Sequence, residues 1–284
     1  MKISVVTTVY ERPEHFRLFL ASMEAQARRP DEIVAADDGS GEAVAKEIWR
    51  LARECAVPVR IVRQEHEGYR VAAARNLALR AVKGDYAIFL DCDMAAMPDL
   101  VAVHEGAAAP GRVLSGSRAL LGEEASEGLF AVKPHPDRQA WEMAWRRADK
   151  SEMEAADAEW KKQARLRRWH LAKGHKPKVK GCHFSLPMEM VRAVNGFDER
   201  FVGWGYEDDD FARRLYKAGC EPGSVIETAR AMHLWHPTLA PAAGGQHRDR
   251  PNRAYFRRWF VPARCKEGLE RGEGWTGARR RGSF

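Results

Sequence analysis

The sequence predicts an α/β fold in which helices flank a mixed central sheet. Over the first hundred residues, short apolar runs alternate with segments of helical periodicity, a pattern typical of parallel strands joined by helices. One apolar run, residues 86–90, ends abruptly in Asp91-Cys92-Asp93. Ligands of open α/β sheets bind at the carboxyl ends of the strands, so this acidic triplet lies where a functional site is expected.

The individual elements follow from these patterns. In the first half we expect strands at residues 3–9, 32–36, 59–62 and 86–90. We expect one helix that begins at Pro13 and three further helices at residues 41–54, 71–81 and 98–108. In the second half we expect strands at 113–121, 182–186, 225–226 and 231–233, a long charged helix at 139–170, a short helix from Pro187 and a helix through 211–216. Pro13 suits a first helical turn because the N–H that it lacks has no partner there.

Composition limits the class of protein. The 284 residues are 45% hydrophobic and 31% charged, which is ordinary for a globular chain and excludes a collagen-like or mainly disordered one. The five cysteines form no CxxC pair, so we expect reduced thiols and neither a disulfide framework nor a structural zinc site. No uncharged apolar run approaches the ~18 residues that cross a bilayer. We therefore expect a cytoplasmic protein, with peripheral contact at the inner membrane face as an alternative.

The net charge of +7 is concentrated in two segments. Residues 141–180 contain 12 Lys/Arg and 6 Asp/Glu, and residues 248–284 contain 11 and 4. Both could contact an anionic membrane or an acidic polymer, although a solvated helix face and a frayed tail would look the same. We expect no nucleic-acid partner, because the best site candidates are carboxylates and no nucleic-acid-binding signature occurs.

Asp37-Asp38-Gly39-Ser40-Gly41 follows a predicted strand and precedes a predicted helix. It does not fit a dinucleotide-binding fingerprint, because Val44 occupies the last position of the glycine pattern. A carboxylate only accepts hydrogen bonds, so Asp38 could bind the N–H of a uracil ring. It could equally cap the following helix.

Two segments supply candidate metal ligands. Asp91 and Asp93 are two residues apart in an extended segment, so both carboxylates can face one cleft. Oxygen ligands suit Mg²⁺ or Mn²⁺ beside a nucleotide diphosphate, and an imidazole from His233 or His236 would favour Mn²⁺. Taken alone, an Asp-x-Asp triplet fits a solvated turn and the histidines fit a structural role.

The segment 203–210, GWGYEDDD, combines turn glycines, two aromatic rings and four consecutive carboxylates. Adjacent acids repel one another when they are buried, so a purely structural segment has little reason to contain them, although a solvated helix N-terminus would tolerate them. A carboxylate in an aromatic-lined pocket is a candidate general base, because desolvation raises its pKa toward neutrality.

Together these segments resemble family-2 glycosyltransferases of the GT-A fold that have a galactosyltransferase-like C-terminal part. The resemblance spans about residues 2–240 and rests on SVVTTVYERPE, VAADDGS, GYRVAAARNLAL, FLDCDM, CHFSLPMEMVRAVNGFDERFVGWGYEDDDFARRL and MHLWHP, in that order. The group includes bacterial chondroitin polymerases and is similar to polypeptide N-acetylgalactosaminyltransferases and β-1,4-galactosyltransferases. The resemblance implies a Rossmann-like, nucleotide-diphospho-sugar transferase fold.

The resemblance also implies roles for individual residues. It places Thr8, Tyr10, Glu11 and Asp38 in the uridine pocket, Arg75 near the nucleotide, Asp91 at the ribose, Asp93 and His233 on the metal, Trp204 and Gly205 around the sugar, Glu207 on sugar or acceptor, and Asp208 as the base. Asp91 and His236 are further candidate metal ligands. Asp209 and Asp210 are expected to be less critical, because the following helix would carry them away from the cleft.

We therefore expect one domain over residues 1–240, with a nucleotide-binding half (1–110) and an acceptor half (111–240) that share one sheet. Residues 141–180 form its charged helical insertion, and 241–284 a basic C-terminal extension. The expected reaction transfers a hexose or N-acetylhexosamine from a UDP-sugar, with Mn²⁺ or Mg²⁺, to a hydroxyl of a glycan, lipid-linked glycan or peptide, with inversion. Alternatives are a retaining transferase, a nucleic-acid-binding protein and a catalytically silent sugar-binding module.

Overall fold

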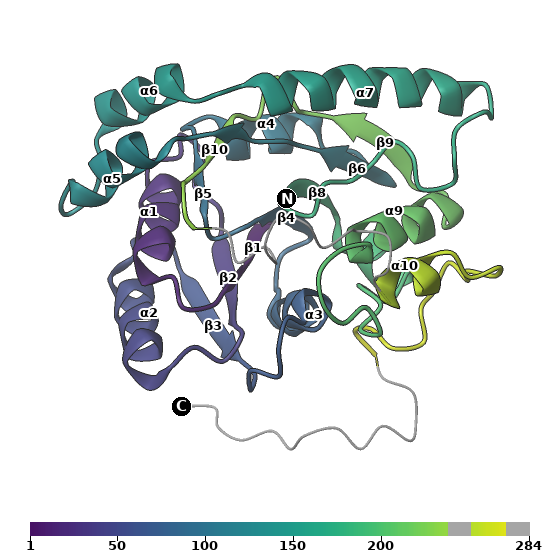
Figure 1. The fold of residues 1–284 in the computed structure, drawn as a ribbon, viewed down its shortest axis with the longest axis horizontal. Helices are drawn as coiled ribbons and strands as arrows, with labels where there is room; N and C mark the ends of the chain where they lie inside the picture. The colour runs from purple at the N-terminus through teal and green to yellow at the C-terminus, as the bar shows by residue number, and fades with distance from the viewer. Residues whose placement is uncertain (238–250, 271–284) are drawn as a thin grey trace.

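A computed structural model describes residues 1–237 and 251–270. Its central sheet has seven strands: β1 (Ile3–Val9), β2 (Glu32–Asp37), β3 (Val59–Arg63), β4 (Tyr86–Leu90), β6 (Arg112–Ser115), β8 (His183–Pro187) and β9 (Glu221–Ser224). The order across the sheet is β3-β2-β1-β4-β8-β6-β9 (Figure 1). The first four strands are parallel, and β8 is antiparallel to both β4 and β6. The predicted mixed α/β sheet is thus confirmed.

Helices cover both faces of this sheet. Helices α1 (Pro13–Glu24), α2 (Glu42–Glu54) and α4 (Leu100–Ala107) pack on one face, and α3 (Val71–Ala81), α8 (Met188–Ala193) and α9 (Glu207–Lys217) pack on the other (Figure 1). Val5 and Val6 of β1 belong to different hydrophobic clusters, because successive side chains of a strand point to opposite faces. The continuous apolar runs read from the sequence are therefore strands buried on both faces.

A second, three-stranded sheet departs from the expectation of one shared sheet. It consists of β5 (Met94–Ala96), β10 (Ala231–His233) and β7 (Ala119–Leu120), in that order. Helices α5 (Glu123–Ala131) and α6 (Arg138–Arg147) contribute to the hydrophobic cluster beneath it. This small sheet brings residues near position 93 beside residues near position 233.

Two expected elements are each divided in the structure. Residues 113–121 form β6 and β7, which belong to different sheets, and Gly116 lies between them, where a Cβ would collide with the His183 ring. The predicted helix 139–170 is broken into α6 and α7 (Ser151–Arg168). Asp149 causes this break, because its backbone N–H and C=O pair with Leu120 instead of continuing a helix.

Other expectations fail near the C-terminus. No strand forms at residues 225–226: β9 ends at Ser224, and the N–H groups of Thr228 and Ala229 bond to the Val225 carbonyl in a turn. Residues 251–270 pack against the body of the protein and begin with α10 (Pro251–Phe256). The rest of the expected C-terminal extension lies outside the described residues. All five cysteines are free thiols, as predicted.

Candidate active site

Asp93, His233 and His236 converge at one edge of the small sheet. Asp93 lies between β4 and β5, and β10 pairs antiparallel to β5, which places His233 opposite Met94. The Asp93 Oδ2 atom lies 3.5 Å from His233 Nε2 and 3.2 Å from His236 Nε2. One candidate ligand atom from each side chain lies within 4.8 Å of the others. The pairing of β10 with β5 thus brings together residues that are 140 positions apart in the chain.

This cluster has the chemistry of a divalent-cation site. Burial alone would raise the pKa of Asp93, but hydrogen bonds from His233 and His236 hold it well below its usual range. The second carboxylate oxygen, Oδ1, is buried and has no hydrogen-bond partner among the described residues. Because a buried, unpaired carboxylate oxygen is unfavourable, an ion with mixed oxygen and nitrogen ligands fits the site.

Arg75 connects the two halves of the site. It projects from α3, is 5% exposed, and lies with Nη2 3.4 Å from Asp91 Oδ1 and Nη1 3.3 Å from Glu207 Oε1. Its Nη2 also donates to the Gly181 carbonyl at 3.0 Å. A buried guanidinium with fixed donors is well suited to orient two carboxylates. Asp91 thus faces Arg75, and the three-residue cation cluster does not include it.

Glu207 and Asp208 begin α9 at the same cleft. The chain enters this helix through Gly205 and Tyr206, which have positive φ values of 96° and 74°. Burial and the neighbouring charge of Asp208 raise the pKa of Glu207 to about 7. Burial and the charge of Asp209 likewise raise the pKa of Asp208. Raised carboxyl pKa values are what a general base near neutral pH requires.

Asp209 and Asp210 point to other partners. Lys178 Nζ lies 2.8 Å from Asp209 Oδ2. Asp210 is fully buried, and its carboxylate pairs with Arg214 at 2.7 Å and with Arg258 at 2.9 Å. The helix therefore turns these carboxylates toward separate ion pairs, and Asp210 joins α9 to the C-terminal segment.

The residues expected around uridine follow β1 and β2. Tyr10 stacks on His66 with ring centroids 4.1 Å apart. The Asp38 side chain accepts a hydrogen bond from Gln64, and burial raises its pKa. Thr8 lies near the end of β1, half-buried. Glu11 accepts a hydrogen bond from the Gly41 N–H, so it stabilises the start of α2.

Trp204 and Gly205 lie in the loop before α9. The Trp204 side chain is 58% exposed. The Asn252 side chain donates to the carbonyl of Gly205 at 3.0 Å, so the first residues of α10 help to hold this loop. This contact was not expected, because the resemblance ends near residue 240.

Several residues of the cleft were missed at the level of sequence. Arg118 follows β6 and is attracted by Asp91, Asp93 and Glu152, which raise its pKa although burial opposes them. Gly181 donates its N–H to Asp208 Oδ2 at 3.2 Å. Lys178 reaches Asp209, as described above. The signal that could have revealed Lys178 is the alternation of lysines at 176, 178 and 180 within the basic segment.

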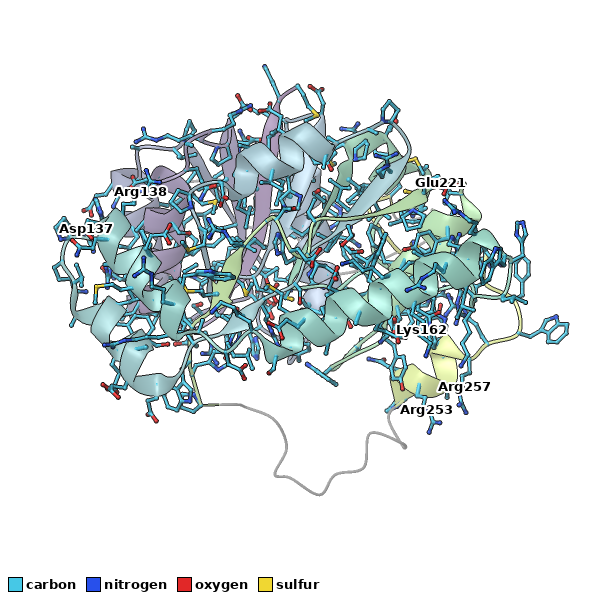
Figure 2. All side chains as sticks on the ribbon, turned by 90° about the horizontal axis from the view of Figure 1, so that it is seen from above. Asp137, Arg138, Lys162, Glu221, Arg253 and Arg257 are labelled. Carbon is cyan, nitrogen blue, oxygen red and sulfur yellow. The ribbon has the colours of Figure 1, made fainter. Side chains whose placement is uncertain are left out.

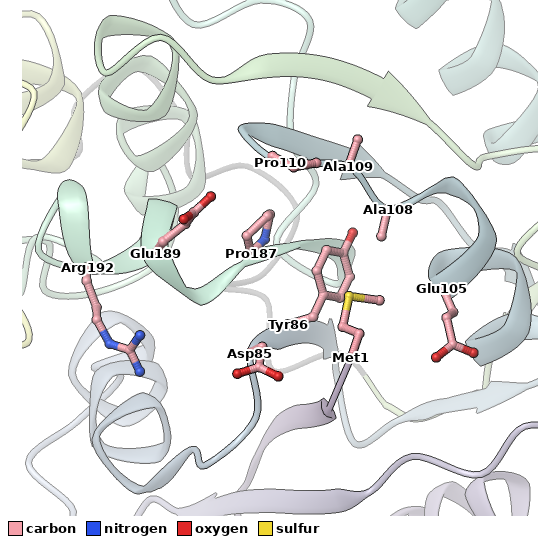
Figure 3. Close-up of a pocket in the computed structure, with 10 residues that line it drawn as sticks. All are labelled: Met1, Asp85, Tyr86, Glu105, Ala108, Ala109, Pro110, Pro187, Glu189 and Arg192. Atoms are coloured by element: carbon pink, nitrogen blue, oxygen red, sulfur yellow. The ribbon is translucent and has the colours of Figure 1, made fainter.

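A pocket of the structure lies away from these residues. It has a volume of about 680 Å³ and is lined by Asp85, Tyr86, Glu105, Pro187 and Arg192 among others (Figure 3). Asp85 immediately precedes β4, whereas Asp91 follows it, so this pocket opens at the amino end of the strand. The chemistry-bearing residues instead gather at the carboxyl end, where ligands of α/β sheets bind.

Known proteins match both parts of the chain. Residues 4–115 match the family described as glycosyl transferase family 2, and residues 164–237 match the N-terminal domain of galactosyltransferase. The chain is 31% identical over 247 residues to chondroitin synthase of Escherichia coli, covering 83% of this chain and 35% of the relative. It is 30% identical over 230 residues to validoxylamine A glucosyltransferase of Streptomyces hygroscopicus subsp. limoneus, covering 76% and 48%. The chain thus spans a third to a half of the length of these relatives.

Solved structures share the fold. A mannosyltransferase from Pyrobaculum calidifontis, in complex with GDP-Man and Mn²⁺, superposes with a TM-score of 0.55 at 16% identity, over 86% of this chain and 58% of that chain. Residues 1–349 of S. aureus TarS, in complex with UDP-GlcNAc, give 0.54 at 13% identity, over 84% and 60%.

The fold thus has the GT-A architecture of glycosyltransferases. More particularly, residues 4–115 match glycosyl transferase family 2, and a galactosyltransferase-like segment follows. The resemblance inferred from sequence is confirmed. Among the described residues, no helix is long and apolar enough to cross a membrane.

Proposed function

We propose that this protein transfers a hexose or N-acetylhexosamine from a UDP-sugar to an acceptor hydroxyl, with a divalent cation and with inversion. The observation that carries the proposal is the convergence of Asp93, His233 and His236 within one cleft that also contains the Arg75-linked carboxylates Asp91 and Glu207. One part of this cleft suits a cation and a diphosphate, and the other offers carboxylates of raised pKa to the acceptor.

Asp93, His233 and His236 would hold the cation, for which Mn²⁺ is preferred over Mg²⁺ because imidazole nitrogens are among the ligands. When bound, the cation supplies positive charge that stabilises the departing diphosphate. The orphaned Oδ1 of Asp93 supports this assignment. Asp91 remains a further candidate, although its carboxylate faces Arg75.

The donor would lie along the carboxyl ends of β1, β2 and β4. Thr8, Tyr10, Glu11 and Asp38 are proposed to form the uridine pocket, Asp91 to face the ribose, and Trp204 and Gly205 to border the sugar. Asp38 supports this role because its buried carboxylate can accept a hydrogen bond from a uracil N–H. Arg75 would fix Asp91, so the ribose would meet an oriented acceptor group.

Asp208 is proposed to be the general base. As the acceptor oxygen attacks the anomeric carbon, its proton passes to the Asp208 carboxylate and the bond from that carbon to the UDP oxygen breaks. The Gly181 N–H fixes one oxygen of Asp208, and burial raises its pKa toward the range where it can accept a proton. Glu207, held by Arg75, would bind the sugar or the acceptor.

The acceptor is proposed to be a hydroxyl of a glycan, a lipid-linked glycan or a peptide. Basic segments 141–180 and 248–284 are proposed to approach an anionic acceptor or membrane surface, which would place the protein in the cytoplasm or at the inner membrane face. Figure 2 labels Lys162 on α7, Arg253 on α10 and Arg257 directly after α10, all in one half of the molecule. Residues 248–250 and 271–284 of these segments lie outside the described residues.

A panel of UDP-sugars assayed for UDP release, with and without Mn²⁺, tests the proposal. We expect one donor to give Mn²⁺-dependent release that increases with a suitable acceptor. The anomeric configuration of the product, read by NMR, then separates inversion from the retaining alternative. The donor assignment would be overturned if no UDP-sugar released UDP while a sugar linked to another nucleotide released that nucleotide.

A further inference from the structure

A second, smaller hollow lies beside the proposed base. It has a volume of about 80 Å³ and lies between α7 and the segment that leads to β8. We call it the Trp160 pocket; its lining residues are Gly116, Ala156, Glu159, Trp160, Gln163, Lys176, Lys178, Lys180 and Ile226. Three of these residues are lysines, and one is an aromatic side chain from the middle of α7.

The lysines line the pocket because of the local backbone. Residues 178–180 form no helix, and Pro177 and Val179 are buried while Lys178 and Lys180 are not. Alternate residues of an extended segment point to the same side, so the apolar side chains anchor the segment and the lysines face outward. Tyr216 of α9 donates its hydroxyl proton to the Pro177 carbonyl at 2.8 Å, which fixes this segment against the helix that carries Asp208.

The same segment also contacts the proposed base. Gly181, which follows Lys180 directly, donates its N–H to Asp208. Lys178 pairs with Asp209, the next residue along α9. A sugar chain whose hydroxyl reaches Asp208 therefore has this segment, and the Trp160 pocket, beside it.

Two polar groups in the pocket have no partner of their own. The indole N–H of Trp160 is buried and meets no hydrogen-bond acceptor among the described residues. Lys178 and Lys180 pair with Asp209 and Glu152, but no described carboxylate lies within ion-pair distance of the Lys176 ammonium group. Burial and the positive charge of Lys178 lower the pKa of Lys176, although Asp209 and Glu159 attract its charge without forming an ion pair with it.

These groups are suited to an anion attached to a sugar. The Lys176 ammonium group and the Trp160 N–H can both donate to one anionic group, and charge-assisted hydrogen bonds of this kind are the strong ones. The volume suits a single substituent more than a whole sugar ring, which would lie at the mouth of the pocket. A neutral sugar would leave the Lys176 ammonium group without an ion-pair partner among the described residues.

We propose that the Trp160 pocket binds an anionic substituent of the acceptor glycan, close to the sugar whose hydroxyl is glycosylated. This inference rests on the proposed function, because it takes Asp208 as the group that meets the acceptor. It deepens that proposal by assigning the acceptor to the anionic glycans.

Direct binding measurements test the pocket without requiring turnover. The probes are tetragalacturonate, a heparin tetrasaccharide, poly(glycerol phosphate) and neutral cellotetraose, titrated calorimetrically into the full-length protein at low salt. We expect at least one anionic probe to bind, and cellotetraose to bind at least tenfold more weakly. Comparison of the three anionic probes shows whether the pocket prefers the carboxylate of tetragalacturonate, the sulfate of heparin or the phosphate of poly(glycerol phosphate).

Matched variants locate the binding. Lys176→Gln should weaken the anionic probe about tenfold, and Trp160→Phe, which keeps a ring but removes the N–H, should weaken it a few-fold. Lys83→Gln is the control, because it removes the same charge from an exposed position that lies outside the basic segments and does not line the pocket. Circular dichroism and the melting temperature check that each variant folds.

Three results would overturn the proposal: no anionic probe binding more tightly than about 1 mM, equal binding of cellotetraose, or equal losses in Lys176→Gln and Lys83→Gln. Binding to anionic vesicles but to no anionic glycan would assign these lysines to a membrane instead. A UDP titration with Mn²⁺ is run separately. Its failure would count against the proposed donor and leave the glycan result intact, so the two proposals fail independently.

Discussion

Arg75 Nη1 lies 3.3 Å from Glu207 Oε1, although the two residues are 132 positions apart in the chain. The same guanidinium lies 3.4 Å from Asp91, so one buried cation joins the end of β4 to the start of α9. This ion pair links the family-2 segment of the chain to the galactosyltransferase-like segment. Glu207 nevertheless keeps a raised pKa, because burial and Asp208 outweigh the attraction to Arg75.

The pH dependence of transfer should reflect this carboxylate pair. Glu207 and Asp208 titrate together, and the pKa of Glu207 is raised to about 7. A protonated carboxyl cannot accept the acceptor's proton, so kcat/KM should fall as the pH drops and Asp208, whose pKa is raised, takes up a proton. Glu207→Gln removes a neighbouring negative charge, which should lower the pKa of Asp208 and move this fall to lower pH. An unchanged profile in Glu207→Gln would assign the fall to another group.

Asp208→Asn should abolish general-base catalysis while the fold is kept. We expect transfer to drop by ~10²–10⁴-fold with UDP binding unchanged. Glu207→Gln should instead weaken sugar or acceptor binding and raise KM, because a contact residue acts on ground and transition states alike. Asp85→Asn, at the opposite end of β4, is the matched control. Near-normal turnover of Asp208→Asn, or a product that retains the donor's configuration, would exclude Asp208 as the base.

UDP binding should require a divalent cation. Calorimetric titration of UDP should give a clearly tighter Kd with Mn²⁺ than in EDTA, since the proposed site offers oxygen and nitrogen ligands. Asp93→Ala should abolish the difference, and His233→Ala and His236→Ala should each reduce it. His135→Ala, an exposed histidine outside the cluster, should leave it intact. Equal affinity in Mn²⁺ and EDTA would contradict the metal assignment.

A buried histidine pair should make stability depend on pH. His104 and His183 share a 2.8 Å hydrogen bond between their Nε2 atoms, and His183 Nδ1 donates to the Ser117 carbonyl. Burial holds the pKa of His183 at about 4, and burial with the neighbouring His183 holds that of His104 well below its usual value. Both rings are therefore neutral in the folded protein at neutral pH.

The unfolded chain has ordinary histidine pKa values near 6.5, so its histidines bind protons first as the pH falls. The contribution of this pair to stability is complete above about pH 6.5 and is lost progressively toward pH 4. Melting temperatures between pH 7.5 and 4.5 should fall more steeply for the wild type than for His104→Asn, which cannot be protonated. If the melting temperatures of the wild type and His104→Asn fell equally with pH, the histidine pair would not control the loss of stability in acid.

Exposed aromatic side chains next to α10 should support contact with anionic membranes. Trp259 is fully exposed and Phe260 is 70% exposed, and Arg257 on the same segment is exposed too. Each basic residue near an anionic leaflet contributes about 1 kcal/mol, and tryptophan favours the interface. Flotation should show binding to anionic vesicles at low salt that weakens at high salt and in Trp259→Ala, but not in Met143→Ala. No binding to anionic vesicles at low salt would exclude this contact.

Local pattern predicted much of the fold. The strands 3–9 and 86–90 and the helix 71–81 form with the predicted bounds, because apolar periodicity, Pro and Gly act over a few residues. Prediction failed where contacts between distant residues decide the structure: Asp149 pairs with Leu120 and breaks the long helix, and Gly116 lies against His183 where the expected strand 113–121 is interrupted. Such contacts join positions tens of residues apart and leave no local signal.

The sequence by itself determined which side chains are candidates for the chemistry, because the type and order of carboxylates, imidazoles and glycines do not depend on the fold. Only the tertiary structure decided which of them meet. Strand pairing of β10 with β5 brings both histidines to Asp93, and Arg75 turns Asp91 and Glu207 toward each other. Lys176, Lys178 and Lys180 show this difference most clearly. In the sequence they form a basic run, whereas in the structure the buried Pro177 and Val179 anchor the segment so that the three lysines line a pocket near Asp208. Charge is a property of each residue, whereas a site is a property of the distances between residues, and those distances are fixed by packing.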